Sequence, residues 1–199
     1  MASPVNIFNT ALARIGSSIF IQSETEQSLQ NSICSRFYTD VRDRVLSEWD
    51  WGFARKSVDL QDIGTPPTGW DYRFRRPNDC LKIWDIIDAN LCPVYSWQIM
   101  EDETADSLAI VVVAYTLQTL PLTARYTAIV ENPALFSQKF TNCLCWALAS
   151  EIAGPLSAKQ EYVKAAGDAY SLALIQAMQQ DQSERKEPVT VSEYEIARQ

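Results

Sequence analysis

The chain has 199 residues, of which 47 % are hydrophobic and 21 % are charged, and its formal net charge is −8. These values are typical of one globular domain, or of a domain with an insertion, that buries a proper core. The acidic balance argues against a protein that wraps nucleic acid over a broad surface. The sequence contains no histidine, which removes the commonest general base and every Ser-His or Cys-His nucleophile.

The sequence also limits the compartment and the chemistry. No apolar run reaches the roughly 20 residues that a membrane span requires. Residues 1–13 lack the basic start and apolar centre of a secretory signal, so we expect a protein made in the cytosol. The five cysteines form no Cys-x-x-Cys pair. We therefore expect buried, reduced thiols, and neither a metal nor a cofactor.

Two helices are expected at the start of the chain. Residues 3–16 begin with Ser-Pro and end with Gly, which are typical helix boundaries. Residues 24–55 repeat apolar side chains at helical spacing and predict a long central core helix that packs against two neighbours. Ser23 and Glu26 have the spacing of a capping box at its start. The apolar stripe of this helix comprises Leu29, Ile33, Phe37, Val41, Val45 and Trp49, and it is widened by Cys34, Tyr38 and Leu46 one position on.

An aromatic cluster, residues 49–53 (WDWGF), is expected to close this helix, because Gly52 lets the chain turn there. The cluster has two interpretations. Its rings either plug the end of a helical core or form the centre of a protein interface, where aromatic side chains contribute much of the binding free energy. The sequence pattern favours the core.

Residues 57–131 have the alternation of short strands. Trp70, Tyr72 and Phe74 alternate with charged residues, which predicts a half-buried strand. Residues 64–69 contain two prolines and two glycines and predict a loop. Further strands are expected at residues 81–88, 94–100, 109–115 and 122–130. Together they predict a small, mainly antiparallel sheet inserted after the second helix.

Helical spacing returns after residue 131. The Asn-Pro pair at 132–133 predicts the start of a third helix, and the Gly-Pro pair at 154–155 predicts its end. Ser157 is expected to cap a fourth helix that ends near Met178. The fold class is therefore α+β. Its expected parts are a four-helix bundle (residues 1–56 and 132–182), a β insertion (57–131) and an extended C-terminal arm (183–199).

Two motifs resemble the head-to-tail adaptor family of short-tailed bacteriophages, the family of the tail tubular protein A or gatekeeper ring protein. The first motif lies in residues 34–55 (CxxFYxxVRD followed by WxWxFAR), and the second lies in residues 70–81 (WxYxFxxPxDCL). Either motif alone is only an aromatic-rich core, whereas the pair is more specific. The signature positions are Phe37, Tyr38, Val41, Arg42, Trp49, Trp51, Phe53, Trp70, Tyr72 and Pro77.

The resemblance implies a structural protein of the virion tail, not an enzyme, that is assembled in the host cytoplasm. Subunits of this family form a dodecameric ring below the portal protein, extend the DNA channel, help to retain the packaged genome and receive the tail nozzle or tube. The implied partners are the portal protein, the nozzle or tube protein, further copies of the chain, and double-stranded DNA that passes without sequence recognition; no membrane is implied.

The C-terminal arm is the implied contact with the portal. Its apolar residues alternate with polar ones after the proline, so it either adds a strand to the edge of a partner's sheet or is disordered. The residues expected at the portal interface are Pro188, Val189, Val191, Tyr194 and Ile196.

Two charged groups in the β insertion also have two interpretations each. Arg73, Arg75 and Arg76 either line a channel and contact DNA phosphates or form the solvated face of a strand. The acidic residues at 101–103, with Asp106, either bind a hard cation or form an exposed turn. The turn is favoured, because the ligand spacing and the glycine of a calcium loop are absent from the sequence.

Two rival functions stay open. One is a virion-associated cell-wall hydrolase that uses two carboxylates across a cleft. The other is a helical interaction module with no viral role. A glycan-release assay discriminates the first, and removal of the arm discriminates the second.

Overall fold

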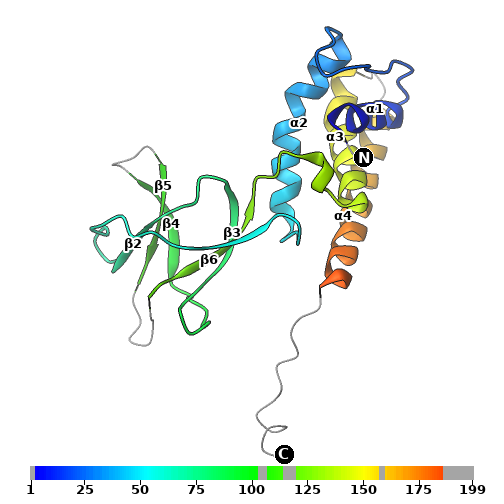
Figure 1. The fold of residues 1–199 in the computed structure, drawn as a ribbon. Helices are drawn as coiled ribbons and strands as arrows, with labels where there is room; N and C mark the ends of the chain where they lie inside the picture. The colour runs from blue at the N-terminus through cyan, green and yellow to red at the C-terminus, as the bar shows by residue number, and fades with distance from the viewer. Residues whose placement is uncertain (1–2, 103–106, 114–119, 157–159, 186–199) are drawn as a thin grey trace, which may run out of the picture.

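The computed structural model describes residues 3–102, 107–113, 120–156 and 160–185. These residues form an α+β fold with four α-helices, one short 3-10 helix, and six strands in two antiparallel three-stranded sheets. The helices stand together in one half of the molecule and the strands in the other (Figure 1). The predicted fold class and the order of helices, strands and helices along the chain are confirmed.

The first two helices differ in how well their starts were predicted. Helix α1, Pro4–Arg14, begins as expected, since the Ser3 side chain accepts a hydrogen bond from the Asn6 amide. Helix α2, Leu29–Glu48, begins later than expected, and Ser28 caps it instead of Ser23. The predicted capping box is wrong because the Asn31 side-chain amide donates to the carbonyls of residues 24 and 26, which holds them in a turn before the helix.

Helix α2 buries one side of the predicted stripe more deeply than the other. Cys34, Tyr38, Val41 and Val45 are buried, whereas Leu29 at the predicted start of the stripe is 66 % exposed. Phe37 is half-buried. Tyr38 lies on the deeper side, because α1 packs against it through the ring of Phe8, whose centroid lies 5.3 Å away.

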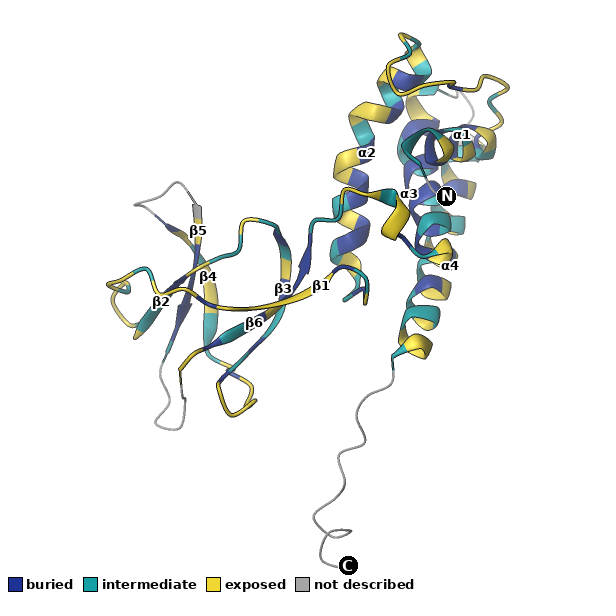
Figure 2. Ribbon diagram, viewed as in Figure 1, coloured by how far each residue is buried: buried dark blue, intermediate teal, exposed yellow. Residues whose placement is uncertain are grey.

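Helix α3, Gln138–Leu156, is the helix around which the others pack, since α1, α2 and α4 (Gln160–Glu184) all contact it. Figure 2 shows buried residues along α3, between its neighbours. The expectation that the second helix is the central one is therefore wrong. Eight side chains of α3 are fully buried: Phe140, Cys143, Leu144, Ala147, Leu148, Ala149, Ile152 and Ala153.

The boundaries of the last helices also correct the sequence analysis. The Asn132 side chain caps only the 3-10 helix Pro133–Leu135, and α3 starts after Ser137, whose hydroxyl accepts from the Phe140 amide. Pro155 lies inside the last turn of α3. Ser157 lies outside the described residues. Helix α4 reaches Glu184, so the first two residues of the predicted arm are helical, and the portal-interface residues 188–196 lie outside the described part of the chain.

The strands form two sheets rather than the single sheet that was expected. The first has the order β1-β6-β3, and the second has the order β2-β5-β4. Asp62 bridges to Phe74, and Pro93 bridges to Ile87, so the segments that lead into β2 and β4 each cross from one sheet to the other. The strands are β1 (Arg55–Asp59), β2 (Tyr72–Arg75), β3 (Cys80–Ile87), β4 (Trp97–Asp102), β5 (Ser107–Val112) and β6 (Thr123–Ala128).

The two sheets enclose a second hydrophobic core, separate from that of the helices. Strand β3 contributes Cys80, Ile83 and Ile86, which lie three residues apart instead of alternating. Two register shifts in its pairing with β6 explain this spacing, because a bulge adds a residue and turns the following side chains to the other face.

Replacement of Val41 by aspartate tests the placement of the helical core. Val41 is 2 % exposed, so the V41D side chain would bury a charge without a partner, and we expect a loss of about 3 kcal/mol or more in the free energy of unfolding. Thr39 on the same helix is exposed, and T39D is expected to change stability by less than about 0.5 kcal/mol. Equal thermal midpoints for the two variants would contradict this assignment.

Candidate interaction surfaces

The aromatic cluster after α2 belongs largely to the helical core. Trp51 is 1 % exposed, and its indole Nε1 donates to the Val45 carbonyl at 2.9 Å. Its ring meets Phe140 edge-on with 5.0 Å between centroids, and Phe53 meets the same ring at 4.9 Å. These contacts favour the core interpretation for Trp51, while Trp49 and Phe53 are only half-buried.

Asp181, near the end of α4, binds this cluster through three donors. Its carboxylate accepts from the Gly52 amide at 2.8 Å, from the Trp49 indole at 3.1 Å and from Arg185 at 2.5 Å. The approach is close, because a Cβ at position 52 would lie 3.3 Å from Asp181 Oδ1. The end of the last helix is therefore attached to the turn that leads from α2 into the sheets.

A second acidic residue extends this attachment to the β part. Asp50 accepts a hydrogen bond from Arg55 Nε at 3.0 Å, at the start of β1, and lies 3.7 Å from the guanidinium of Arg185. The four charged groups alternate in sign, so each carboxylate has a cationic partner. Arg185, the last described residue, thus remains joined to the body of the protein.

The ten signature positions of the adaptor resemblance divide between the two cores. Positions 37–53 pack in the helical core, where Tyr38, Val41, Arg42 and Trp51 are buried. Burial raises the pKa of Tyr38 to about 12, and Arg42 bonds Asp43 at 2.8 Å. In the β part Trp70, Tyr72 and Pro77 are half-buried. The first motif therefore lies in the helical core, whereas the second contributes Phe74 and Cys80 to the β core and packs Leu81 against the helical core.

The three arginines proposed for a DNA channel have different surroundings. Arg73 pairs with Asp102, and the two side chains are only 15 % and 5 % exposed. Arg76 donates to the carbonyls of Cys80 and Leu81. Only Arg75 is exposed. They do not form a continuous exposed strip of positive charge.

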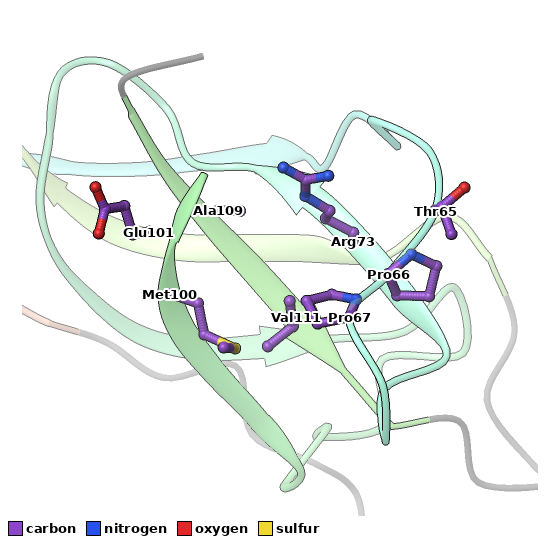
Figure 3. Close-up of a pocket in the computed structure, with 8 residues that line it drawn as sticks. All are labelled: Thr65, Pro66, Pro67, Arg73, Met100, Glu101, Ala109 and Val111. Atoms are coloured by element: carbon purple, nitrogen blue, oxygen red, sulfur yellow. The ribbon is translucent and has the colours of Figure 1, made fainter. Parts of the chain in front are cut away.

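A cavity of about 250 Å³ lies on the outer face of the second sheet, where Arg73 sits (Figure 3). Ala109 and Val111 line it from β5, and the prolines of the 64–69 loop stand opposite Met100. Glu101 is its one carboxylate among the described residues. A small molecule can enter this site, but the lining that the structure describes lacks the second carboxylate that glycoside hydrolysis uses.

The acidic turn at 101–106 is only partly described. Glu103 and Asp106 lie outside the described residues, and Asp102 is buried against Arg73. In the part of the chain that the structure describes, no group of three histidine, cysteine, aspartate or glutamate residues is placed to hold a metal ion. Within the same residues, none of the helices has the length and apolar character of a membrane span.

The sequence analysis missed the most exposed apolar side chains. Tyr95 is 84 % exposed and Leu91 is 77 % exposed, both in the loop between β3 and β4. Leu172 and Ile175 are about half exposed on the outer face of α4. The sequence contains a signal for the exposed loop between β3 and β4, since residues 89–96 include no charged residue in a chain of which 21 % is charged.

Comparisons with known proteins give no relative of this chain. None of the protein-family models matches it, and a search of curated proteins finds no match.

Removal of the Asp181 carboxylate tests the attachment of α4. In D181A the Gly52 amide and the Trp49 indole lose a charged acceptor, and we expect a loss of about 2 kcal/mol in urea unfolding. Asp168 is exposed on the same helix, so D168A serves as the matched control with a change below about 0.5 kcal/mol. If both variants unfold at the parent midpoint, the carboxylate does not hold the helix end.

Thiol labelling tests the burial of the cysteines. All five were expected to be buried, and this expectation is wrong for one of them. Cys92 is exposed in the loop after β3, while the other four are buried. Burial raises the pKa of Cys34 and Cys143 to about 12 and of Cys145 to about 11, so these thiols stay neutral and unreactive at pH 8. We expect a thiol-reactive dye to modify one cysteine in the folded protein and five in denaturant. Modification of folded C92S would contradict this.

Proposed function

We propose that the chain is a head-to-tail adaptor of a short-tailed bacteriophage, a structural protein that joins the portal to the tail nozzle or tube. The observation that carries the proposal is the pair of signature motifs. Their residues provide core side chains on both sides of the joint between helices and strands, and the elements follow in the order helices, β part, helices. This order matches the one that the family resemblance implies.

In this proposal the four helices act as one bundle, and the residues after Arg185 act as an arm that binds the portal. The attachment of Arg185 to Asp181 and Asp50 supports this role, because it gives a segment that follows it a defined starting point. Twelve copies form a ring in the virion tail, and the binding free energy summed over identical contacts replaces any catalytic step.

The charge of the chain supports passage of DNA rather than its retention by contact. The net charge is −8, and of the three candidate arginines only Arg75 is exposed to solvent. Few phosphate contacts per copy leave the duplex free to slide during ejection. Retention of the genome is then a matter of closure of the ring and of the next tail component, not of tight binding.

The rival functions receive less support. Among the described residues, the cavity in the β part has a single carboxylate, whereas a cell-wall hydrolase uses two. A plain interaction module with no viral role gives no reason for both signature motifs to be present. We propose no enzymatic activity, no cofactor and no membrane contact.

The test is to mix the purified chain with the portal ring encoded beside it, followed by size-exclusion chromatography with mass detection. We expect saturable co-elution as a stoichiometric ring. A deletion that starts at Lys186 spares the ion pairs of Arg185 and is expected to keep the parent melting temperature while it weakens portal binding at least about tenfold. A chain that never co-elutes with the portal at micromolar concentration contradicts the adaptor function, and unchanged binding of the deletion variant contradicts the role of the arm.

A further inference from the structure

Strand β1 forms an open edge of the first sheet. It pairs with β6 on one side, and the strand order β1-β6-β3 places no strand of the described residues on its other side. All five of its residues are exposed, and Figure 2 draws them in yellow. Val58 lies opposite the buried Ala124, on the face of the sheet that carries the β core, yet it is 40 % exposed. The β core is therefore uncovered along this edge.

The backbone of β1 also has hydrogen-bonding groups at this edge. The Ala128 amide donates to the Ala54 carbonyl at 2.8 Å just before the strand begins. Because bonded and non-bonded pairs alternate in an antiparallel ladder, every second residue from Ala54 onward bonds to β6. The amides and carbonyls of Arg55, Ser57 and Asp59 point away from β6, and among the described residues these backbone groups have no hydrogen-bond partner. Such an edge pairs readily with a further strand, and proteins commonly cover it.

The last described residue lies beside the start of this edge. Arg185 Nη1 is 3.7 Å from the Asp50 carboxylate, which accepts a hydrogen bond from Arg55 Nε at 3.0 Å. Arg55 is the first residue of β1. One carboxylate thus connects the end of α4 to the beginning of the open edge, and the chain continues from there into residues 186–199.

The sequence after Arg185 has the pattern of a strand. Residues 186–188 can span up to about 10 Å, which allows the chain to pass from Arg185 to the neighbouring edge. Pro188 lacks an amide donor, and proline is tolerated at the first residue of a strand. The next residues, VTVSE at 189–193, begin with valine in alternation with threonine and serine, a pattern typical of a half-buried strand.

Two other occupants of the edge are less favoured. A second copy that pairs through its own β1 brings another charge of −8 to the contact, and so does a second copy that supplies its arm. The segment that follows Arg185 in the same copy starts beside the edge. Its effective concentration there is in the millimolar range, and its binding requires no association between molecules.

We propose that residues 189–193 add to the open edge of β1 of the same copy as a further strand in the free subunit. Both strands start at the joint between the helices and the β part, so they run parallel. Val189 and Val191 then lie on the face of Val58 and cover it, and the outward backbone groups of β1 gain partners.

The contact itself does not depend on the adaptor function, whereas its consequence rests on that function. An arm that lies on β1 is not available to the portal, so the portal competes with the edge of β1 for the same residues. The free subunit thereby keeps both its arm and its sheet edge occupied until it meets a portal ring.

Amide hydrogen exchange of the full chain, read by NMR at several protein concentrations, tests the contact. The amides of Ser57 and Asp59 face the open edge, and we expect them to exchange at least about tenfold more slowly than in a deletion that starts at Lys186. The amides of Lys56 and Val58 bond to β6 in both proteins, so they are the control within the same strand. We expect the protection to be independent of protein concentration.

Two full-length variants test the face of the added strand. V191D places a charge on the face of the β core, and we expect the edge amides to exchange as fast as in the deletion. T190D is the matched control, because successive side chains of a strand point to opposite faces, and it is expected to keep the protection.

Each outcome has a distinct meaning. Equal exchange of the edge amides in the full chain and in the deletion overturns the contact, and so does equal exchange in V191D and T190D. Protection that rises with protein concentration assigns the edge to a second copy and also overturns the proposal. Addition of the portal ring is expected to bring the exchange to the rate of the deletion, and portal binding with unchanged protection overturns the competition. A chain that keeps the protection but never binds the portal supports the contact and contradicts only the adaptor function.

Discussion

The hydrogen bonds that Asp181 accepts from the turn after α2 are the contact on which the arrangement of the molecule depends. One carboxylate receives the Gly52 amide and the Trp49 indole, and Arg185 pairs with it one helical turn later. The last helix is thereby tied to the point where the chain leaves the helices for the sheets. Because the acceptor is charged and only 14 % of its side chain is exposed, these bonds hold the geometry more strongly than neutral bonds at the surface would.

The same joint carries the backbone from one hydrophobic core to the other. The Ala128 amide donates to the Ala54 carbonyl at 2.8 Å, so the end of β6 lies beside the start of β1. Lys82 on β3 donates to the Ser47 carbonyl at the end of α2, where a cation also offsets the helix dipole. Each part has its own buried cluster, and these polar contacts join the two parts together with Leu81 of β3, which packs against the helical core.

Local patterns in the sequence were sufficient for the class of fold and for most strands, because capping and alternation act between residues close in the chain. These local patterns gave wrong predictions where contacts between residues further apart in the chain determine the structure. Ser23 has a valid capping spacing, yet the Asn31 side chain holds the preceding residues in a turn. The strands expected in one sheet form two because β6 pairs with β1 and β3 while β5 pairs with β2 and β4, and these partners are far apart in the chain. The exposed apolar side chains of residues 89–95 were missed although the conformation of this loop is local, since the Asp88 carboxylate accepts from the amides of Asn90 and Cys92.

The net negative charge of the chain opposes association between copies, whereas the apolar character of its proposed contacts favours association. Each copy carries a charge of −8, and at physiological ionic strength salt screens the repulsion between copies until they come within a Debye length of about 8 Å. In the proposed ring, a contact between two copies is opposed by this repulsion. The contact is therefore short-ranged and weak for a single pair, and it becomes effective only when many copies are held at high local concentration. In the proposed function a portal ring supplies that concentration, which would explain how an acidic subunit assembles into a ring only where the portal is.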